Sequence, residues 1–303
     1  MLTLAHLTDL HLGPLPRAES WLDYIGKRAI GAYSWHQRRR YVHDPAVAAA
    51  MTADIKAHKP DHVALTGDLI NIALAQEFQA AAKWLRDFGP PDWISLVPGN
   101  HDAYRPFPWA KGAGLWADYM TGDMRIDGPR GATFATSFPY VRLRRNVALI
   151  GSTSAVPQAL FRAGGHLGSP QISMIRGLLK DLRERGYYRV LLTHHPPLSG
   201  MTPSRRALDD AAELKDVLEA EGSELVLHGH NHRNMHTTLK SRFGTVNIFA
   251  PPSASTPEAG RDDPAAWNLY SIRRQDGDWH TGVTIRSWVA ADKAFVSQKS
   301  FFL

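Results

Sequence analysis

The sequence predicts a single α/β domain, because apolar runs of strand length alternate with helical patterns and turn residues mark where each one ends. The first three strands are expected at residues 2–8, 62–66 and 93–97. Helical patterns at residues 46–58 and 75–88 lie between them; Pro45 opens the first and Gly89 follows the second. Strands joined by helices in this way form sheets with parallel neighbours.

The alternation continues in the second half of the chain. Further strands are expected at residues 146–152, 189–193, 225–227 and 246–249, and further helices at residues 172–185 and 205–221. The tail carries two alternating runs at residues 267–273 and 279–288, with Asp276 and Gly277 between them as a hairpin turn. The tail is therefore predicted to be antiparallel β structure within the same domain, which spans residues 1–303.

Two stretches fall outside this alternation. Residues 104–139 are rich in Gly, Pro and aromatic residues and show no period, so a long loop excursion is expected there. Residues 13–45 are predicted to form a cap or lid. Within them, residues 17–40 interleave aromatic and aliphatic side chains with six basic residues against two acidic. Three interpretations of this segment remain open: a helix packed on the core, a lid over substrate, or a contact with an anionic membrane.

The composition excludes several classes of protein. The chain has 303 residues, a formal charge of +6 and no cysteine, which rules out disulfides, thiolate metal sites and thiol nucleophiles. No basic region precedes the first apolar run, and no apolar run approaches about 20 residues, so neither a signal peptide nor a transmembrane helix is expected. A cytoplasmic protein is predicted, with a peripheral position at the inner membrane as the alternative.

Carboxylates, imidazoles and one carboxamide gather in five short clusters. These are Asp9 to His11, Gly67–Asp68, Gly99 to Asp102, His194–His195 and Gly229 to His232. Each cluster directly follows a predicted strand, and ligands of open α/β sheets bind at the carboxyl ends of the strands. The five clusters are therefore expected to meet along one edge. The isolated histidines, His43 among them, have no partner at a telling spacing and are expected to be structural.

The clusters supply a mixed set of oxygen and nitrogen ligands. The candidates are Asp9, His11, Asp68, Asn100, His194, His230 and His232. Such a set suits manganese, iron or zinc and suits calcium poorly. Seven ligands are too many for one ion, whereas two ions about 3.5–4 Å apart, bridged by one carboxylate and by a nucleophilic hydroxide, account for the number. Two divalent or mixed-valence transition-metal ions are therefore predicted, suited to in-line attack on phosphorus.

The order of the clusters, Asp-X-His, Gly-Asp, Gly-Asn-His-Asp, His and Gly-His-X-His, resembles that of the calcineurin-like metallophosphoesterases over residues 9–232. The resemblance implies a four-layer αββα sandwich, in which two mixed sheets are flanked by helices. It also implies that Asp68 bridges two metals. The first metal would be held by Asp9, His11 and His232, and the second by Asn100, His194 and His230.

The resemblance also implies the remaining roles at the site. His101 would bind the phosphate or donate a proton to the leaving oxygen, and Asp102 would orient it; a general acid is needed there because an alkoxide leaves poorly. His194 is placed on the metal because it directly follows its strand, and His195 is expected to line the site and contact substrate. Gly99 would leave room for a close approach of the backbone.

The expected activity is hydrolysis of a phosphodiester, because the cluster spacing and residues 194–197 resemble the bacterial cyclic-nucleotide and glycerophosphodiester branch most closely. Alternative enzymes are a lipid-linked nucleotide pyrophosphatase or phospholipid-headgroup hydrolase, suggested by the basic aromatic segment, and an exonuclease. Nucleic acid is the less favoured substrate, because a nuclease is expected to show a broad basic groove. A non-catalytic binding module on the same fold is a further alternative, and the oligomeric state stays open.

Overall fold

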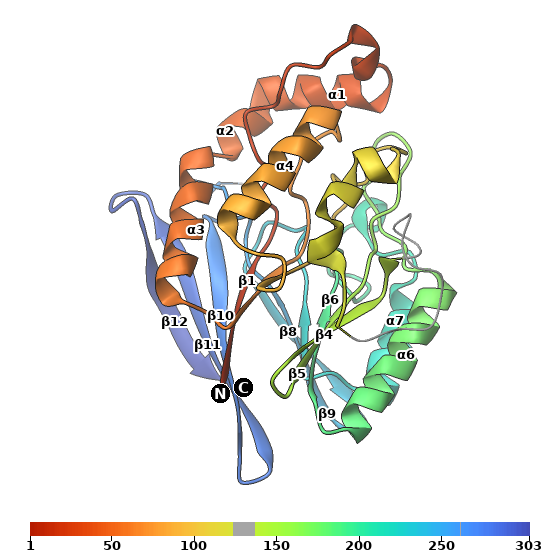
Figure 1. Ribbon diagram of the computed structural model, residues 1–303, viewed down its shortest axis with the longest axis vertical. Coiled ribbons are helices and arrows are strands. Elements are labelled where there is room, and N and C mark those ends of the chain that lie inside the picture. Colours follow the sequence, from red (N-terminus) through yellow and green to blue (C-terminus); the bar gives the residue numbers. More distant parts are fainter. Residues whose placement is uncertain (124–136, 261) are drawn as a thin grey trace.

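Two six-stranded mixed sheets pack face to face at the centre of the protein (Figure 1). The computed structural model describes residues 1–123, 137–260 and 262–303. The first sheet has the order β12-β11-β10-β1-β2-β3. Its strands are β1 (Leu2–Leu7), β2 (His62–Leu65), β3 (Ile94–Leu96), β10 (Ala266–Gln275), β11 (Asp278–Val289) and β12 (Ala294–Phe302). Because β1, β2 and β3 run parallel, their carboxyl ends meet at one edge.

The second sheet has the order β4-β5-β6-β7-β9-β8. Its strands are β4 (Tyr140–Arg144), β5 (Val147–Gly151), β6 (Tyr188–Leu192), β7 (Leu225–Leu227), β8 (Met235–Ser241) and β9 (Gly244–Ala250). The four central strands are parallel, and β4 and β8 add antiparallel edges. The carboxyl ends of β6 and β7 therefore share an edge of this sheet too.

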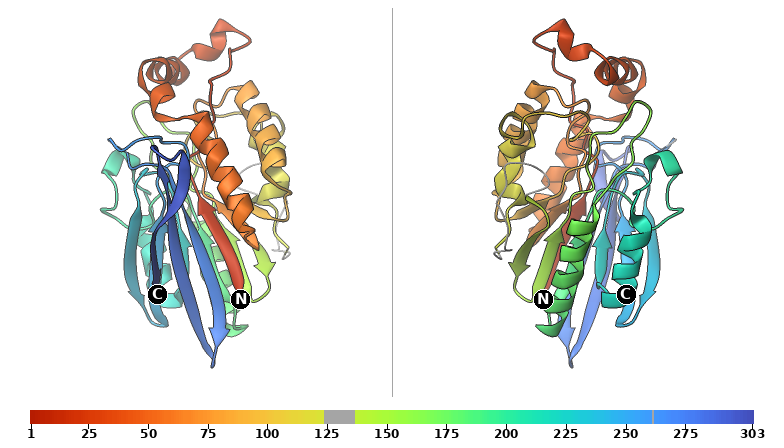
Figure 2. Two further views of the ribbon diagram at one scale, coloured as in Figure 1. Left: turned by 90° about the vertical axis from the view of Figure 1, so that its left-hand side faces the viewer. Right: turned by 90° about the vertical axis from the view of Figure 1, so that its right-hand side faces the viewer.

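Helices cover the outer faces of both sheets (Figure 2). α3 (Pro45–His58) and α4 (Ala75–Phe88) contribute Met51 and Phe78 to the large core that also holds β1 and the facing side of the second sheet. α6 (Ser169–Glu184) and α7 (Ala211–Glu221) pack Ile175 and Leu214 on the other side of the second sheet. The four-layer αββα sandwich that the resemblance implies is confirmed.

The structure differs from the sequence prediction at the edges of the sheets. β4, β8 and β12 were not predicted, because edge strands such as β8 and β12 are half exposed and carry too few apolar residues to stand out. α7 begins at Ala211, whereas the sequence predicted that this helix begins at residue 205. A 3-10 helix, η5 (Ser204–Arg206), comes first, and the carboxylate of Asp210 then accepts hydrogen bonds from the backbone of Leu167 and Gly168, so that the chain between η5 and Ala211 does not continue as one helix.

Residues 13–45 form a series of short helical segments at the top of the molecule in Figure 1. They are η1 (Trp21–Tyr24), α1 (Lys27–Ser34), η2 (Trp35–Arg39) and α2 (Arg40–Val42). They lie beyond the carboxyl end of β1, on the side of the molecule where the candidate clusters gather. In the described part of the chain, no helix has the length and apolar character needed to cross a membrane.

The stretch at residues 104–139 is described only in part, and residues 124–136 lie outside the described residues. The described part contains two 3-10 helices, η3 (Trp109–Lys111) and η4 (Ala113–Met120). Trp116 is buried and donates from Nε1 to the carbonyl oxygen of Phe78 at 3.1 Å. This part therefore packs on α4 as a piece of the core.

Candidate metal centre

The loops that follow the strands hold their polar residues in an unusual backbone conformation. Five of the seven candidate ligands have a positive φ: Asp9, His11, Asp68, His230 and His232. A non-glycine residue in this region costs on the order of 1–3 kcal/mol and persists only where its surroundings fix it. Here the neighbouring loops fix one another, since the amide of Asp9 donates to Gly67 and the amide of His11 donates to Asp68, both at 2.9 Å.

Two glycines make this close approach of loops sterically feasible. Gly67 has a φ of +93°, and a Cβ atom on it would lie 2.4 Å from the backbone nitrogen of Gly99. A Cβ atom on Gly99 would lie 2.2 Å from Oδ1 of Asp68. A larger residue at Gly99 would therefore displace the Asp68 carboxylate, which gives the expected requirement for a small residue at Gly99 a structural reason.

The first group of candidate ligands surrounds Asp9. Nε2 of His232 lies 3.2 Å from Oδ1 of Asp9 and 3.2 Å from Nε2 of His11. Nε2 of His11 also lies 3.8 Å from Oδ2 of Asp68. Four ligand atoms from three loops therefore face a common point.

The second group lies on the other side of Asp68. Nε2 of His194 lies 3.4 Å from the same Oδ2 atom of Asp68, 3.2 Å from Oδ1 of Asn100 and 3.3 Å from Nδ1 of His230. The other ring nitrogen of His194 contacts the carbonyl oxygen of Thr66 at 2.7 Å, which orients the ring. One oxygen of Asp68 thus faces both groups of imidazoles.

The donor set fits two metal ions. Oδ1 of Asp9 is buried and has Nε2 of His232 beside it at 3.2 Å, but no other hydrogen-bond donor among the described residues, and a buried carboxylate in this position is stabilised by a cation. Around an ion at about 2.1 Å from nitrogen and oxygen ligands, neighbouring ligand atoms lie about 3.0–3.4 Å apart. The contacts within each group fall at or near this spacing. Imidazole nitrogens that face one another at this distance need a cation between them, either a metal ion or the proton that His194 and His232 carry in the metal-free protein.

His195 occupies a different position from His194. Its nitrogen atoms belong to one cluster with those of His194 and His230. However, Nδ1 of His195 is 2.7 Å from Oγ of Ser154 and Nε2 is 3.1 Å from the carbonyl oxygen of Ala163. Both nitrogens are thereby engaged by the protein, so the geometry favours His194 as the ligand. Its ring also packs against His230, at 4.6 Å between ring centroids, and the expected contact of His195 with substrate stays a prediction.

Asp102 does not have the role that the sequence suggested. Its carboxylate accepts hydrogen bonds from four backbone amides, those of Asp68, Leu69, Ile70 and Gly99. His101 is oriented by other groups: Nδ1 contacts the carbonyl oxygen of Asn71, and the ring stacks on Tyr104 at 5.5 Å. The expectation that Asp102 orients His101 is corrected here, because Asp102 instead clamps the two loops that carry Asp68 and Asn100.

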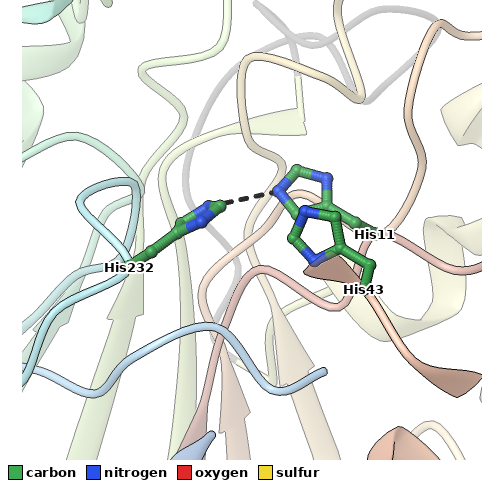
Figure 3. A group of neighbouring side chains, drawn as sticks. All are labelled: His11, His43 and His232. Atoms are coloured by element: carbon green, nitrogen blue, oxygen red, sulfur yellow. Dashed lines mark hydrogen bonds between the residues drawn. The ribbon is translucent and has the colours of Figure 1, made fainter. Parts of the chain in front are cut away.

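Two residues of the lid segment enter the site without having been singled out. His43 packs against His11 at 4.4 Å between centroids, tilted by 47°, and faces His232 at 5.7 Å (Figure 3). Its Nδ1 contacts Oγ of Ser255 at 2.9 Å. Nη2 of Arg39 lies 2.9 Å from Nδ1 of His11. The only sequence signal for Arg39 was the local excess of basic residues, and His43 gave none.

The candidate ligands open onto a cleft of about 240 Å³. It is lined by Arg38, Arg39, Asp68, Asn100, His101, Ala163, Arg206, His230, Asn231, His232 and Asp262. A second cavity of about 350 Å³ adjoins it and shares Arg38 and Asp262 with it. Three arginines against two carboxylates, Asp262 at the rim and Asp68 among the candidate ligands, make the cleft attractive to an anion.

The charges in the centre are strongly coupled. Burial disfavours the ionised form of Asp68, but His194 and then His101 outweigh it and hold the pKa of this carboxyl well below its usual range. Burial opposes protonation of His194 and His232, yet Asp68 raises the pKa of His194 to about 9, and Asp9 with Asp262 raises the pKa of His232 to about 9. Without metal, both rings therefore carry a proton at pH 7.

Metal uptake by the metal-free protein is expected to release protons. A pKa raised above the ordinary value means that the ring stays protonated until the pH approaches about 9, and a metal needs the lone pair. We expect release of about two protons at pH 7, from His194 and His232, and an affinity that rises with pH towards 9. Calorimetric titration with manganese in buffers of different ionisation enthalpy measures both; uptake without proton release contradicts the assignment.

Solved structures share the fold. A dimetal phosphatase from Danio rerio matches with a TM-score of 0.61 at 11% sequence identity, covering 99% of this chain and 98% of that one. The purple acid phosphatase PPD1 from yellow lupin seeds matches with a TM-score of 0.54 at 12% identity, covering 99% of this chain and 53% of that one. These two phosphatases thus have the same sandwich fold as this chain.

The family itself follows from the sequence comparison. The model of the calcineurin-like phosphoesterases matches residues 2–234, so the chain belongs to that family. A probable cyclic nucleotide phosphodiesterase from a Synechococcus strain is 26% identical over 297 residues, which cover 96% of this chain and 94% of the relative. The protein is therefore a phosphoric ester hydrolase, and the expected resemblance is confirmed.

Proposed function

We propose that the protein is a phosphodiesterase with a dinuclear metal centre bridged by Asp68. The observation that carries the proposal is that Oδ2 of Asp68 faces Nε2 of His11 at 3.8 Å and Nε2 of His194 at 3.4 Å. The first metal would take Asp9, His11, Asp68 and His232, and the second Asp68, Asn100, His194 and His230. Manganese, iron and zinc all suit these ligands. The bound ions would supply Lewis acidity and an activated water for attack on phosphorus.

The cationic side chains of the cleft would hold the substrate phosphate in place. Arg39 lies beside the rings of His11 and His101, and its buried position lowers its pKa without removing its charge at neutral pH. Arg206 donates from Nη2 to the carbonyl oxygen of His230 at 2.6 Å, which holds it at the opposite wall. Together they would orient the non-bridging phosphate oxygens and favour the charge of the transition state.

His101 would protonate the leaving oxygen. Burial, and then the charge of Arg39, lower the pKa of His101 to about 3. A bound phosphate adds negative charge beside the ring and so favours its protonated form. Because Nδ1 is engaged by the carbonyl of Asn71, the proton available to the substrate is the one on Nε2. His101 lines the cleft and is thus placed to serve as the general acid.

Two findings favour a diester over a monoester. The second cavity, beyond Arg38 and Asp262, offers room for a substituent on the far side of the phosphate. The relative that aligns over 96% of the chain is described as a probable cyclic nucleotide phosphodiesterase. The complete ligand set also argues for catalysis and against a binding module that has lost it.

The test is a hydrolysis panel at fixed manganese. It compares an aryl phosphodiester and its monoester with cyclic nucleotides, glycerophosphodiesters, phospholipids, nucleoside diphosphate lipids and single-stranded DNA. We expect the diester to be hydrolysed at least about tenfold faster than the monoester, since the second cavity offers room for the second substituent of a diester, and a chelator to stop the reaction. Faster hydrolysis of the monoester, or hydrolysis that survives chelation, contradicts the proposal.

A further inference from the structure

The lid segment exposes apolar side chains and buries polar ones. Arg28 of α1 is buried and donates to the carbonyl oxygens of Ile72 and Ala73. The opposite side of the same segment carries Trp21, Leu22, Ile25, Ile30, Tyr33 and Tyr41, all exposed. Trp21 is 76% exposed and Tyr33 67%. Ala32 and Trp35 of the segment are buried as well, so the exposed side chains form a second apolar face, which an ordinary surface helix does not have.

A second exposed apolar pair lies beside this segment. Leu160 and Phe161 are exposed on the loop at residues 157–163, Phe161 by 75%. Nζ of Lys27 donates to the carbonyl oxygens of Gln158 and Arg162, at 3.2 and 3.4 Å, and so joins the loop to α1. These two segments hold eight of the fifteen large apolar side chains that are exposed among the described residues. We call the surface formed by residues 17–41 and 157–163 the apical surface.

The apical surface borders the cleft on two sides. Arg38 and Arg39 of the lid segment line the cleft, and so does Ala163 of the loop. Figures 1 and 2 show the lid segment as the outermost part of this end of the molecule. Any flat surface that contacts the apical surface would therefore cover the opening of the cleft.

The charges around the apolar side chains are mostly positive. Arg17, Arg38, Arg40 and Arg105 are exposed here. Residues 17–41 hold two acidic side chains, of which Asp23 pairs with Arg28 at 3.4 Å and Glu19 is exposed. Exposed aromatic side chains beside arginines are suited to the boundary between headgroups and acyl chains of an anionic bilayer. The charge thus complements an anionic lipid surface.

We propose that the apical surface docks on an anionic phospholipid bilayer. Docking inserts Trp21, Tyr33 and Phe161 among the headgroups, while Arg17 and Arg40 bind lipid phosphates. It also places the cleft over phosphodiester headgroups, so that membrane phospholipids are the substrate class; this second part rests on the proposed phosphodiesterase function. The structure therefore assigns the enzyme to work at a membrane surface.

The docking is tested by sedimentation with vesicles of phosphatidylcholine alone or mixed with phosphatidylglycerol. The full chain carrying Asp68→Asn is used, which keeps the lipid intact and separates binding from catalysis. We expect binding to the mixed vesicles that salt weakens, and little binding to phosphatidylcholine alone. Adding W21S, Y33S and F161S is expected to weaken binding about tenfold or more. Adding R17Q and R40Q is expected to reduce the preference for phosphatidylglycerol.

The matched control carries F243S and F302S, which replace exposed aromatic side chains outside the apical surface. It is expected to bind the mixed vesicles as strongly as the parent chain. In the otherwise native chain, the triple variant is expected to keep its hydrolysis of a soluble aryl diester, which also shows that it folds. The docking is overturned if the protein does not bind the mixed vesicles or if the control variant loses as much binding as the triple variant. It is also overturned if a partner protein or a second copy of the chain covers the apical surface. Binding without any diester hydrolysis by the native chain leaves the docking supported and overturns the proposed function.

Discussion

Replacing Asp68 with Asn is expected to remove nearly all metal-dependent hydrolysis while the chain stays folded. One oxygen of Asp68 faces both groups of imidazoles, at 3.8 Å from His11 and 3.4 Å from His194, so the substitution weakens both metals at once. Asn is close in size and keeps an oxygen that accepts the 2.7 Å hydrogen bond from the amide of His101. With several kcal/mol of transition-state stabilisation lost, kcat should fall by about 10³-fold or more.

The measurements are metal content after reconstitution and turnover of an aryl phosphodiester. Asp87→Asn is the matched control, since Asp87 is an exposed carboxylate on α4 that pairs with Lys83 at 2.6 Å, and it is expected to keep both metals and full activity. If Asp68→Asn binds two equivalents of metal with unchanged affinity, Asp68 is not the residue that bridges the two metals.

The site residues that could be predicted from the sequence are those that directly follow a predicted strand. A cluster such as Asp9 to His11 ends a buried parallel strand, and parallel strands bring their carboxyl ends to one edge whatever the rest of the fold does. The same holds for His194, which comes two residues after the end of β6. The choice between His194 and His195 needed the structure, because adjacent residues follow the same strand and differ only in what surrounds each ring.

The contributions that were not predicted come from long-range packing. Arg39 and His43 reach the site because the lid segment crosses the carboxyl end of β1, and no spacing along the chain encodes that crossing. The sequence suggested that Asp102 orients its neighbour His101. The carboxylate of Asp102 instead accepts hydrogen bonds from amides more than thirty residues away, at Asp68, Leu69 and Ile70. Proximity in sequence was the wrong guide there, since a buried carboxylate binds the nearest unpaired amides.

Replacing His101 with Ala is expected to leave both metals bound and to lower kcat by about 10²–10⁴-fold, the usual effect of removing a general acid. The proposed ligand sets do not include His101, although one of its ring nitrogens lies within 4.8 Å of ligand atoms of His11 and Asp68, whereas Asn100 places Oδ1 3.2 Å from Nε2 of His194. Asn100→Ala is therefore the comparison variant, and we expect it to lose affinity for the second metal while the first stays bound. Metal titrations of the two variants separate binding from turnover.

The leaving group gives the sharper test of His101. An aryl oxide leaves readily without a proton, whereas an alkoxide does not, so a general acid matters most for alkyl diesters. His101→Ala should slow an alkyl phosphodiester far more than a p-nitrophenyl one. If His101 only binds the phosphate, both substrates lose activity equally, because the phosphate contact is the same in each. Loss of metal from His101→Ala would show that the side chain supports the centre itself, through its packing on His11, because alanine keeps the backbone amide that donates to Asp68.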